Sequence, residues 1–133
     1  NSEKGKKILS NLEKKNKENI KIIQSKEKTL KDEETQIIKQ KNIISEDSYK
    51  EKVNQLKSKI DTFKKDKEGL AKNFNQLRKQ EINKFIKLVD QILGEYVEKN
   101  AIDIVLNKKD ILMGKNEYNI TKEILDLVNK SNK

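Results

Sequence analysis

The side chains that most often carry enzyme chemistry are missing from this chain. Its 133 residues include no histidine and no cysteine, which removes an imidazole base, a thiol nucleophile and an ordinary zinc site. Gly5, Lys6 and Lys7 lack the rest of a phosphate-binding loop, which argues against ATP use. Three consecutive acids at 32–34 lie among lysines in a predicted helix, where a solvated face explains them better than a cation site. We therefore predict a protein that is not an enzyme and uses no metal or cofactor.

The charge pattern favours anionic partners, since 31 basic residues face 22 acidic ones and the net charge is +9. The bases are spread along the chain, and Arg78 is the only arginine. Helices that read DNA concentrate arginine in one block, so the pattern disfavours nucleic acid. Only 32% of the residues are hydrophobic, against roughly 45 to 50% in an ordinary domain. The composition thus excludes a thick core and favours long, thin helices.

A seven-residue repeat predicts a first helix over 5–44 with a narrow apolar seam. The six positions of this track are Leu9, Asn16, Ile23, Leu30, Ile37 and Ile44, and all except Asn16 are apolar. Its companion track begins at Leu12 and Ile20 and then turns polar at Glu27, Glu34 and Lys41. A break at 43–48 follows, in which Ser45 is suited to cap a second helix.

The strongest pattern lies in the predicted second helix, over 46–99. Nine positions alternate there by four and three residues, and eight of them are apolar. They are Tyr49, Val53, Leu56, Ile60, Phe63, Lys67, Leu70, Phe74 and Leu77, with Lys67 as the exception. Because the break is short, the two helices are expected to fold back as an antiparallel hairpin, seam against seam. Gly69 lies inside the second helix and is a candidate flexing point.

Beyond Asn100 the pattern changes from helical to alternating, which predicts a strand over 102–107. Turn residues at 107–110 and a second strand over 111–113 complete a β-hairpin. A short amphipathic helix with Thr121 as its cap closes the chain. An isolated hairpin is marginal in water, so these strands need further strands or a partner chain.

The order of these parts resembles the Skp/OmpH family of periplasmic chaperones. The matching stretches are 1–7 (NSEKGKK), 44–49 (ISEDSY), 102–107 (IDIVLN) with 111–112 (IL), and 119–125 (NITKEIL). The C-terminal block is specific, whereas the helical part alone matches many coiled coils. The resemblance implies a mainly α fold, with a long helical hairpin on a small β body and a short C-terminal helix, assembled as a homotrimer.

The resemblance also implies an arm over 1–99 and a trimerisation body over 100–133, with the body's first strand expected upstream of residue 1. It implies an ATP-independent holdase for unfolded outer-membrane proteins in the periplasm, with anionic lipid as a further candidate partner. The expected assembly residues are Ile102, Ile104, Leu106, Ile111 and Met113. The expected client contacts near the bend are Ile38, Ile43 and Tyr49, which packing of the hairpin tip would also explain.

Two other functions remain open from the residues alone. One is a structural coiled-coil scaffold that holds no client, and the other is a basic helical protein that binds nucleic acid. A scaffold does not need a strand-forming C-terminus, so the pattern at 102–113 disfavours it. Dispersed charge and the placement of Phe63 and Phe74 on the seam disfavour base stacking and nucleic-acid binding.

Overall fold

The computed structural model describes residues 2–131, and helices dominate it. The long helices are α1 (Glu3–Gln40) and α2 (Glu46–Lys99), and the short helix α3 (Thr121–Lys130) lies near the C-terminus. Two single 3₁₀ turns, η1 (Lys108–Asp110) and η2 (Asn116–Tyr118), lie between α2 and α3. The predicted mainly α class is confirmed.

The contacts divide the chain into two units. The hairpin unit comprises Leu12–Leu77, and the terminal unit comprises the residues up to Asn11 together with those from Arg78 onward. This division differs from the expected arm over 1–99 and body over 100–133, which stays a prediction. Both long helices contribute residues to both units.

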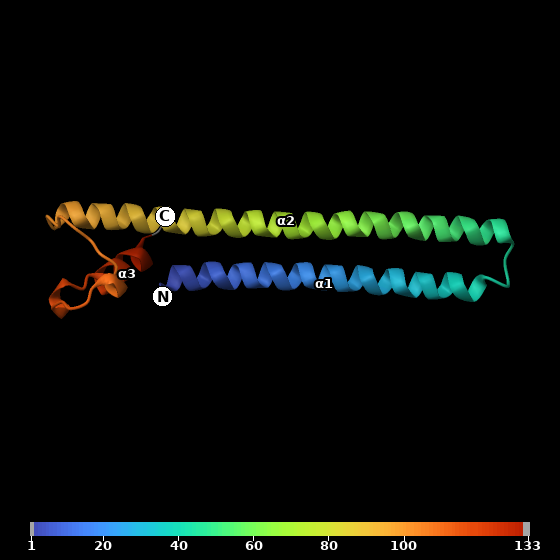
Figure 1. Cartoon of the computed structure of the whole chain (residues 1–133), viewed down its shortest axis with the longest axis horizontal. Helices are drawn as coiled ribbons and strands as arrows, with labels where there is room; N and C mark the ends of the chain where they lie inside the picture. The colour runs from blue at the N-terminus through green and yellow to red at the C-terminus, as the bar shows by residue number, and fades with distance from the viewer. Residues whose placement is uncertain (1, 132–133) are drawn as a thin grey trace. The chain divides into compact units, whose positions relative to one another are not determined.

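In the hairpin unit, α1 and α2 lie side by side and antiparallel (Figure 1). Lys26 on α1 pairs with Asp66 on α2, and Glu33 pairs with Lys59, so residue numbers rise on one helix as they fall on the other. Leu12 and Ile37 of α1 and Leu56 of α2 are the buried apolar side chains of this unit. The predicted antiparallel pairing therefore rests on a narrow seam.

The connection between the long helices begins earlier than the repeat predicts, because α1 ends at Gln40 rather than at Ile44. The carbonyl of Gln40 accepts the N–H groups of Ile43 and Ile44, which closes a tight turn. The Ser45 hydroxyl then accepts the Ser48 N–H at 3.3 Å, as expected of an N-cap. The acids Glu46 and Asp47 in the first turn of α2 complement its dipole.

In the terminal unit, hydrogen bonds connect the start of α1 to the end of α3. The Ser2 hydroxyl caps α1 by accepting the Gly5 N–H at 3.0 Å, and Asn129 Oδ1 on α3 accepts the Glu3 N–H at 2.9 Å. The Lys4 ammonium donates to the Ser131 hydroxyl at 2.9 Å. Two of the N–H groups that a helix start leaves unpaired are thereby satisfied.

The end of α2 forms a Schellman motif without the usual glycine. The Ile102 N–H donates to the Val97 carbonyl at 3.0 Å, and the Ala101 N–H donates to the Glu98 carbonyl at 3.3 Å. Ala101 takes the left-handed conformation that the motif requires, with φ at 48°. The half-buried Ile102 is the apolar residue that usually follows such an end.

The predicted β-hairpin over 102–113 does not form in the single chain. Residues 102–107 have no regular secondary structure, η1 occupies the expected turn, and no strand occurs among residues 2–131. Two short strands with no third strand to cover them bury too little apolar surface to hold a ladder in water. The hairpin prediction is therefore wrong for the isolated protomer.

The expected cap of the last helix is also wrong, because α3 begins at Thr121 itself and Ile120 occupies the N-cap position. The Thr121 side chain makes no capping hydrogen bond, and Asn119 Oδ1 instead accepts the Thr121 N–H at 3.2 Å. Asparagine forms such local bonds to the backbone two residues on, so it competes effectively with threonine for this role.

Substituting Gly69 by Ala should raise the free energy of unfolding by about 1 kcal/mol, because glycine is that much poorer than alanine inside a helix. A Cβ atom at residue 69 meets no atom within 4 Å, so nothing opposes the gain. Chemical denaturation measures the stability, and amide exchange around residue 69 should slow.

The matched control is Gly5→Ala, whose Cβ would lie 3.1 Å from Ser2 Oγ and 3.5 Å from Phe85 Cζ. That variant should gain less, because the capping hydroxyl must shift to make room. Equal stabilities for wild type and Gly69→Ala would contradict the open environment of residue 69.

Val128→Ala should lower the free energy of unfolding by about 2 kcal/mol, through lost burial and the cavity left behind. Val128 is 2% exposed, whereas its neighbour Leu127 is 41% exposed. Leu127→Ala is therefore the control and should cost much less. A larger loss for Leu127→Ala than for Val128→Ala would show that α3 buries a different face.

Candidate functional site

The largest exposed apolar segment lies between α2 and α3. Its exposed fractions reach 74% at Ile104, 64% at Leu106, 99% at Leu112 and 89% at Met113. Side chains of this size are usually withdrawn from water, and a run of them marks an interaction surface. We call residues 102–113 the exposed segment.

Part of the backbone of the exposed segment, over residues 103–107, is available for pairing. Within the described chain, no N–H of residues 103–107 donates to another backbone group, although the Asn107 carbonyl accepts the Asp110 N–H at 2.9 Å. An extended stretch with free N–H and C=O groups and apolar side chains is a template for strand pairing with another chain. This stretch contains the predicted assembly residues Ile104 and Leu106, while Ile102 is half-buried and Ile111 is 43% exposed.

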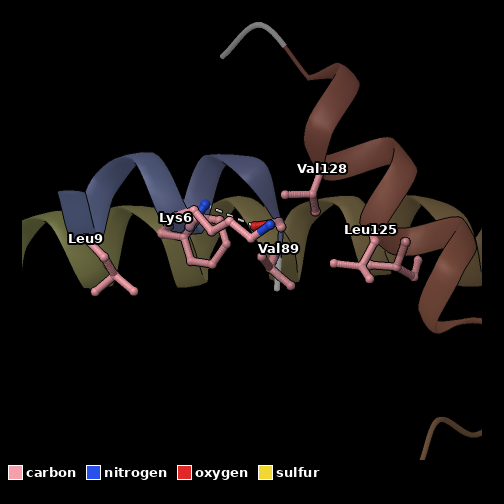
Figure 2. A pocket seen from close by; sticks show the side chains of 9 residues that line it. Lys6, Leu9, Val89, Leu125 and Val128 are labelled. Atoms are coloured by element: carbon pink, nitrogen blue, oxygen red, sulfur yellow. Dashed lines mark hydrogen bonds between the residues drawn. The ribbon is translucent and has the colours of Figure 1, made fainter. Parts of the chain in front are cut away.

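A second feature of the terminal unit is an open cavity of about 340 Å³ between α1, α2 and α3. Figure 2 shows Leu125 and Val128 of α3, Val89 of α2, and Lys6 and Leu9 of α1 around it. Leu9 was expected in the hairpin seam, but it is 63% exposed and lines this cavity instead. The seam runs through Leu12 on the neighbouring track, which leaves Leu9 on the rim.

The charged side chain that lines this cavity, Lys6, forms an ion pair within α1. The Lys6 ammonium donates to Glu3 Oε1 at 2.8 Å, and this hydrogen bond and the lysine's charge lower the pKa of Glu3. In the hairpin unit, Lys17 lowers the pKa of Glu13 in the same way. Both acids are fully exposed, so these pairs act as surface charges.

A row of lysines follows the outer face of α1 in the hairpin unit. Lys14, Lys21 and Lys28 recur every seven residues, are exposed and have no salt bridge among the described residues. At about 1.5 Å per residue, neighbours in this row are about 10 Å apart along the helix. The row is therefore a regular cationic surface that an acidic or anionic partner can reach.

The other predicted seam residues all lie on one side of their helices. Ile37 and Leu56 are buried, and the half-buried members are Ile23, Leu30, Val53, Ile60, Phe63, Leu70, Phe74 and Leu77. The companion track of α1 is displaced by one residue from the expected one, since Asn19 is 8% exposed whereas Ile20 is 44% exposed. Asn19 lies four residues before Ile23 and seven after Leu12, which puts it on the seam.

The predicted client contacts surround the turn of the hairpin unit. Ile38 is 58% exposed and Ile43 is 79% exposed, whereas Tyr49 is half-buried. Ile38 and Ile43 therefore present apolar surface near the turn, and Tyr49 contributes to the packing there. Whether they contact a client stays a prediction.

Two surface features escaped the sequence reasoning. Leu112 is the most exposed large apolar side chain among the described residues. It was not among the predicted assembly residues, although its neighbours Ile111 and Met113 were. The cavity beside Val128 was also missed, because it joins helices that are distant in sequence.

Among residues 2–131, no group of acidic side chains is arranged to hold a metal ion. None of the described helices is both long and apolar enough to span a bilayer.

Comparison with known proteins supports one family. The family model described as "Outer membrane protein (OmpH-like)" matches residues 1–128. Searches of curated proteins and of solved structures give no match for this sequence. Since the family match covers nearly all of the chain, the protein belongs to the OmpH-like outer membrane protein family.

Proposed function

We propose that this protein is an ATP-independent holdase that keeps unfolded outer-membrane β-barrel proteins from aggregating in the periplasm. The family match over residues 1–128 carries the proposal, because this is a family of periplasmic chaperones for outer-membrane proteins. The absence of a phosphate-binding loop in the sequence agrees with a mechanism that uses no nucleotide.

The lysines of the hairpin unit supply the first part of the mechanism. Opposite charge raises the encounter rate of partners, and the row of Lys14, Lys21 and Lys28 faces outward and forms no salt bridge among the described residues. Screening limits this attraction to about 8 Å at physiological ionic strength, so a client is held by many short-range contacts. Acidic unfolded chains fit this surface, and anionic lipid headgroups are a second candidate for it.

The exposed segment supplies the second part, which is assembly. The free N–H groups of residues 103–107 and the apolar side chains of the segment favour strand pairing between copies, so that three copies together build the β body that one copy does not form. The three helical hairpins would then surround a client. A structural coiled-coil scaffold does not need an exposed apolar segment of this kind, so the segment disfavours the scaffold function.

The direct test is the aggregation of a urea-denatured outer-membrane β-barrel protein that is diluted into buffer without nucleotide. Light scattering should fall when the protein is present, and more strongly at 20 mM than at 500 mM salt, because salt screens the lysines. Equal scattering with and without the protein at both salt concentrations would refute the holdase proposal.

Charge reversal tests the role of the lysine row. The triple variant Lys14→Glu, Lys21→Glu and Lys28→Glu should suppress aggregation less well than wild type and lose most of the salt dependence. The control places Arg at the same three positions, keeps the charge and should retain activity. Equal activity of the two variants would remove the row from the mechanism.

Assembly is tested by multi-angle light scattering of the full chain. Wild type should have the mass of three copies, and Ile104→Asp with Leu112→Asp should reduce it to the mass of one copy, because buried acids oppose association. Ile22→Asp, at an exposed position of α1, is the control and should leave the mass unchanged. A single-copy mass for wild type would contradict the trimer.

A further inference from the structure

Two nine-residue stretches of the hairpin unit have the same pattern of residue types. The first stretch is 25–33 (SKEKTLKDE) on α1, and the second stretch is 58–66 (SKIDTFKKD) on α2. Both begin with Ser-Lys, have Thr and then a large apolar residue and Lys at positions five to seven, and end with an acid. The hairpin unit brings these two stretches together.

The ion pairs between the stretches are reciprocal. Lys26 Nζ, at position two of the first stretch, lies 2.6 Å from Asp66 Oδ2, at position nine of the second. Lys59 Nζ, at position two of the second stretch, lies 2.5 Å from Glu33 Oε1, at position nine of the first. Because the helices are antiparallel, a local pseudo-twofold axis relates the two pairs.

The space between the stretches has the same symmetry. A cavity of about 510 Å³ is lined by positions one, two, five, six and nine of each stretch, namely Ser25, Lys26, Thr29, Leu30, Glu33, Ser58, Lys59, Thr62, Phe63 and Asp66. The Thr29 hydroxyl donates to the Ser25 carbonyl at 3.0 Å, and the Thr62 hydroxyl donates to the Ser58 carbonyl at 2.9 Å. Side-chain placement thus repeats along with residue type.

The apolar seam alone does not distinguish between registers of the two helices. Its positions recur every seven residues, so sliding one helix past the other by seven residues again places seam against seam. The connection over 41–45 contains neither glycine nor proline, and the Ser45 cap, worth about 1 kcal/mol, is what marks the start of α2 there. A further interaction along the helices is needed to select the observed register firmly.

The reciprocal charges make that selection. A slide of seven residues in one direction places Lys26 opposite Lys59, and a slide in the other direction places Glu33 opposite Asp66. The first slide also brings Glu33 opposite Lys52, so it keeps one attractive pair beside its like-charge contact, whereas the second slide leaves Lys26 and Lys59 without acids. Both alternatives thus lose attraction and add repulsion, which is unfavourable on facing helices. The observed register is the one in which all four charges are paired.

We infer that Lys26, Glu33, Lys59 and Asp66 form a pseudo-twofold ionic clasp that fixes the register of the α1–α2 hairpin. Exposed ion pairs contribute little to stability, so the clasp acts by penalising displaced registers more than by strengthening the native one. The side chains of Lys26 and Lys59 are 50% and 54% exposed, which keeps them open to screening by salt. This role does not depend on the proposed chaperone function.

The test measures the register by pulsed dipolar spectroscopy on nitroxides at Lys21→Cys and Lys52→Cys, which are exposed positions in a chain without native cysteine. The labels are offset along the hairpin, so a slide of seven residues changes their separation by about 10 Å. Wild type should give one distance peak.

Two charge variants with unchanged net charge separate register selection from simple pairing. The half-inverted variant, Lys26→Glu with Asp66→Lys, keeps both native pairs attractive but turns both like-charge contacts of the displaced registers into attractive ones. The fully inverted variant adds Glu33→Lys and Lys59→Glu, which restores like-charge contacts in both displaced registers.

The clasp predicts an additional peak about 10 Å away in the half-inverted variant, with a displaced population raised about fivefold or more, and a single peak in the fully inverted variant. A single native peak in the half-inverted variant, or mixed peaks in the fully inverted one, would overturn the inference. Wild type in 1 M salt provides a second test, since a Debye length of about 3 Å should also raise the displaced population. An unchanged single peak there would count equally against the clasp.

Discussion

The pairing of α1 with α2 along a narrow seam is the interaction on which the rest of the molecule depends. Helices this rich in charge gain most of their stability from tertiary packing, and the hairpin unit buries only Leu12, Ile37 and Leu56 fully among its apolar side chains. Half-buried neighbours along the seam supply most of the remaining stability, whereas the ion pairs at Lys26, Glu33, Lys59 and Asp66 act on the alignment of the two helices. A seam this thin leaves most lysines in water, where an anionic partner can reach them.

The terminal unit is held together by hydrogen bonds between its helix ends and by one buried valine. Asn129 and Ser131 at the end of α3 accept hydrogen bonds from the start of α1, which Ser2 caps, and Val128 is the most completely buried apolar side chain among the described residues. The segment between α2 and α3 keeps large apolar side chains in water, and the N–H groups of residues 103–107 make no backbone hydrogen bond among the described residues. The terminal unit therefore combines a small packed core with a segment whose large apolar side chains lie exposed.

The sequence predicts the helices well, because each long helix has a strong periodic signal. The second helix spans 46–99 as expected, and its four-three alternation marks the side that packs on α1. The predictions fail where the structure of a segment depends on tertiary contacts that its own sequence pattern does not contain. The alternation at 102–107 is typical of a strand, but a strand needs a neighbour to pair with, and residues 2–131 contain no other strand. Leu9 and Ile20 are apolar at nearly correct spacing, yet Leu12 and Asn19 occupy the seam. The cavity beside Val128 joins residues from both ends of the chain, and no sequence window contains them together.

Hydrogen exchange of the hairpin unit, measured in wild type and in Leu56→Asp, tests the central claim most directly. If the two helices hold each other, a charge in the seam of α2 should reduce amide protection along both α2 and the facing part of α1, since neither helix is stable without the other. Unchanged protection of α1 in that variant would show that it stands alone, and the seam would then not be the interaction that organises the molecule.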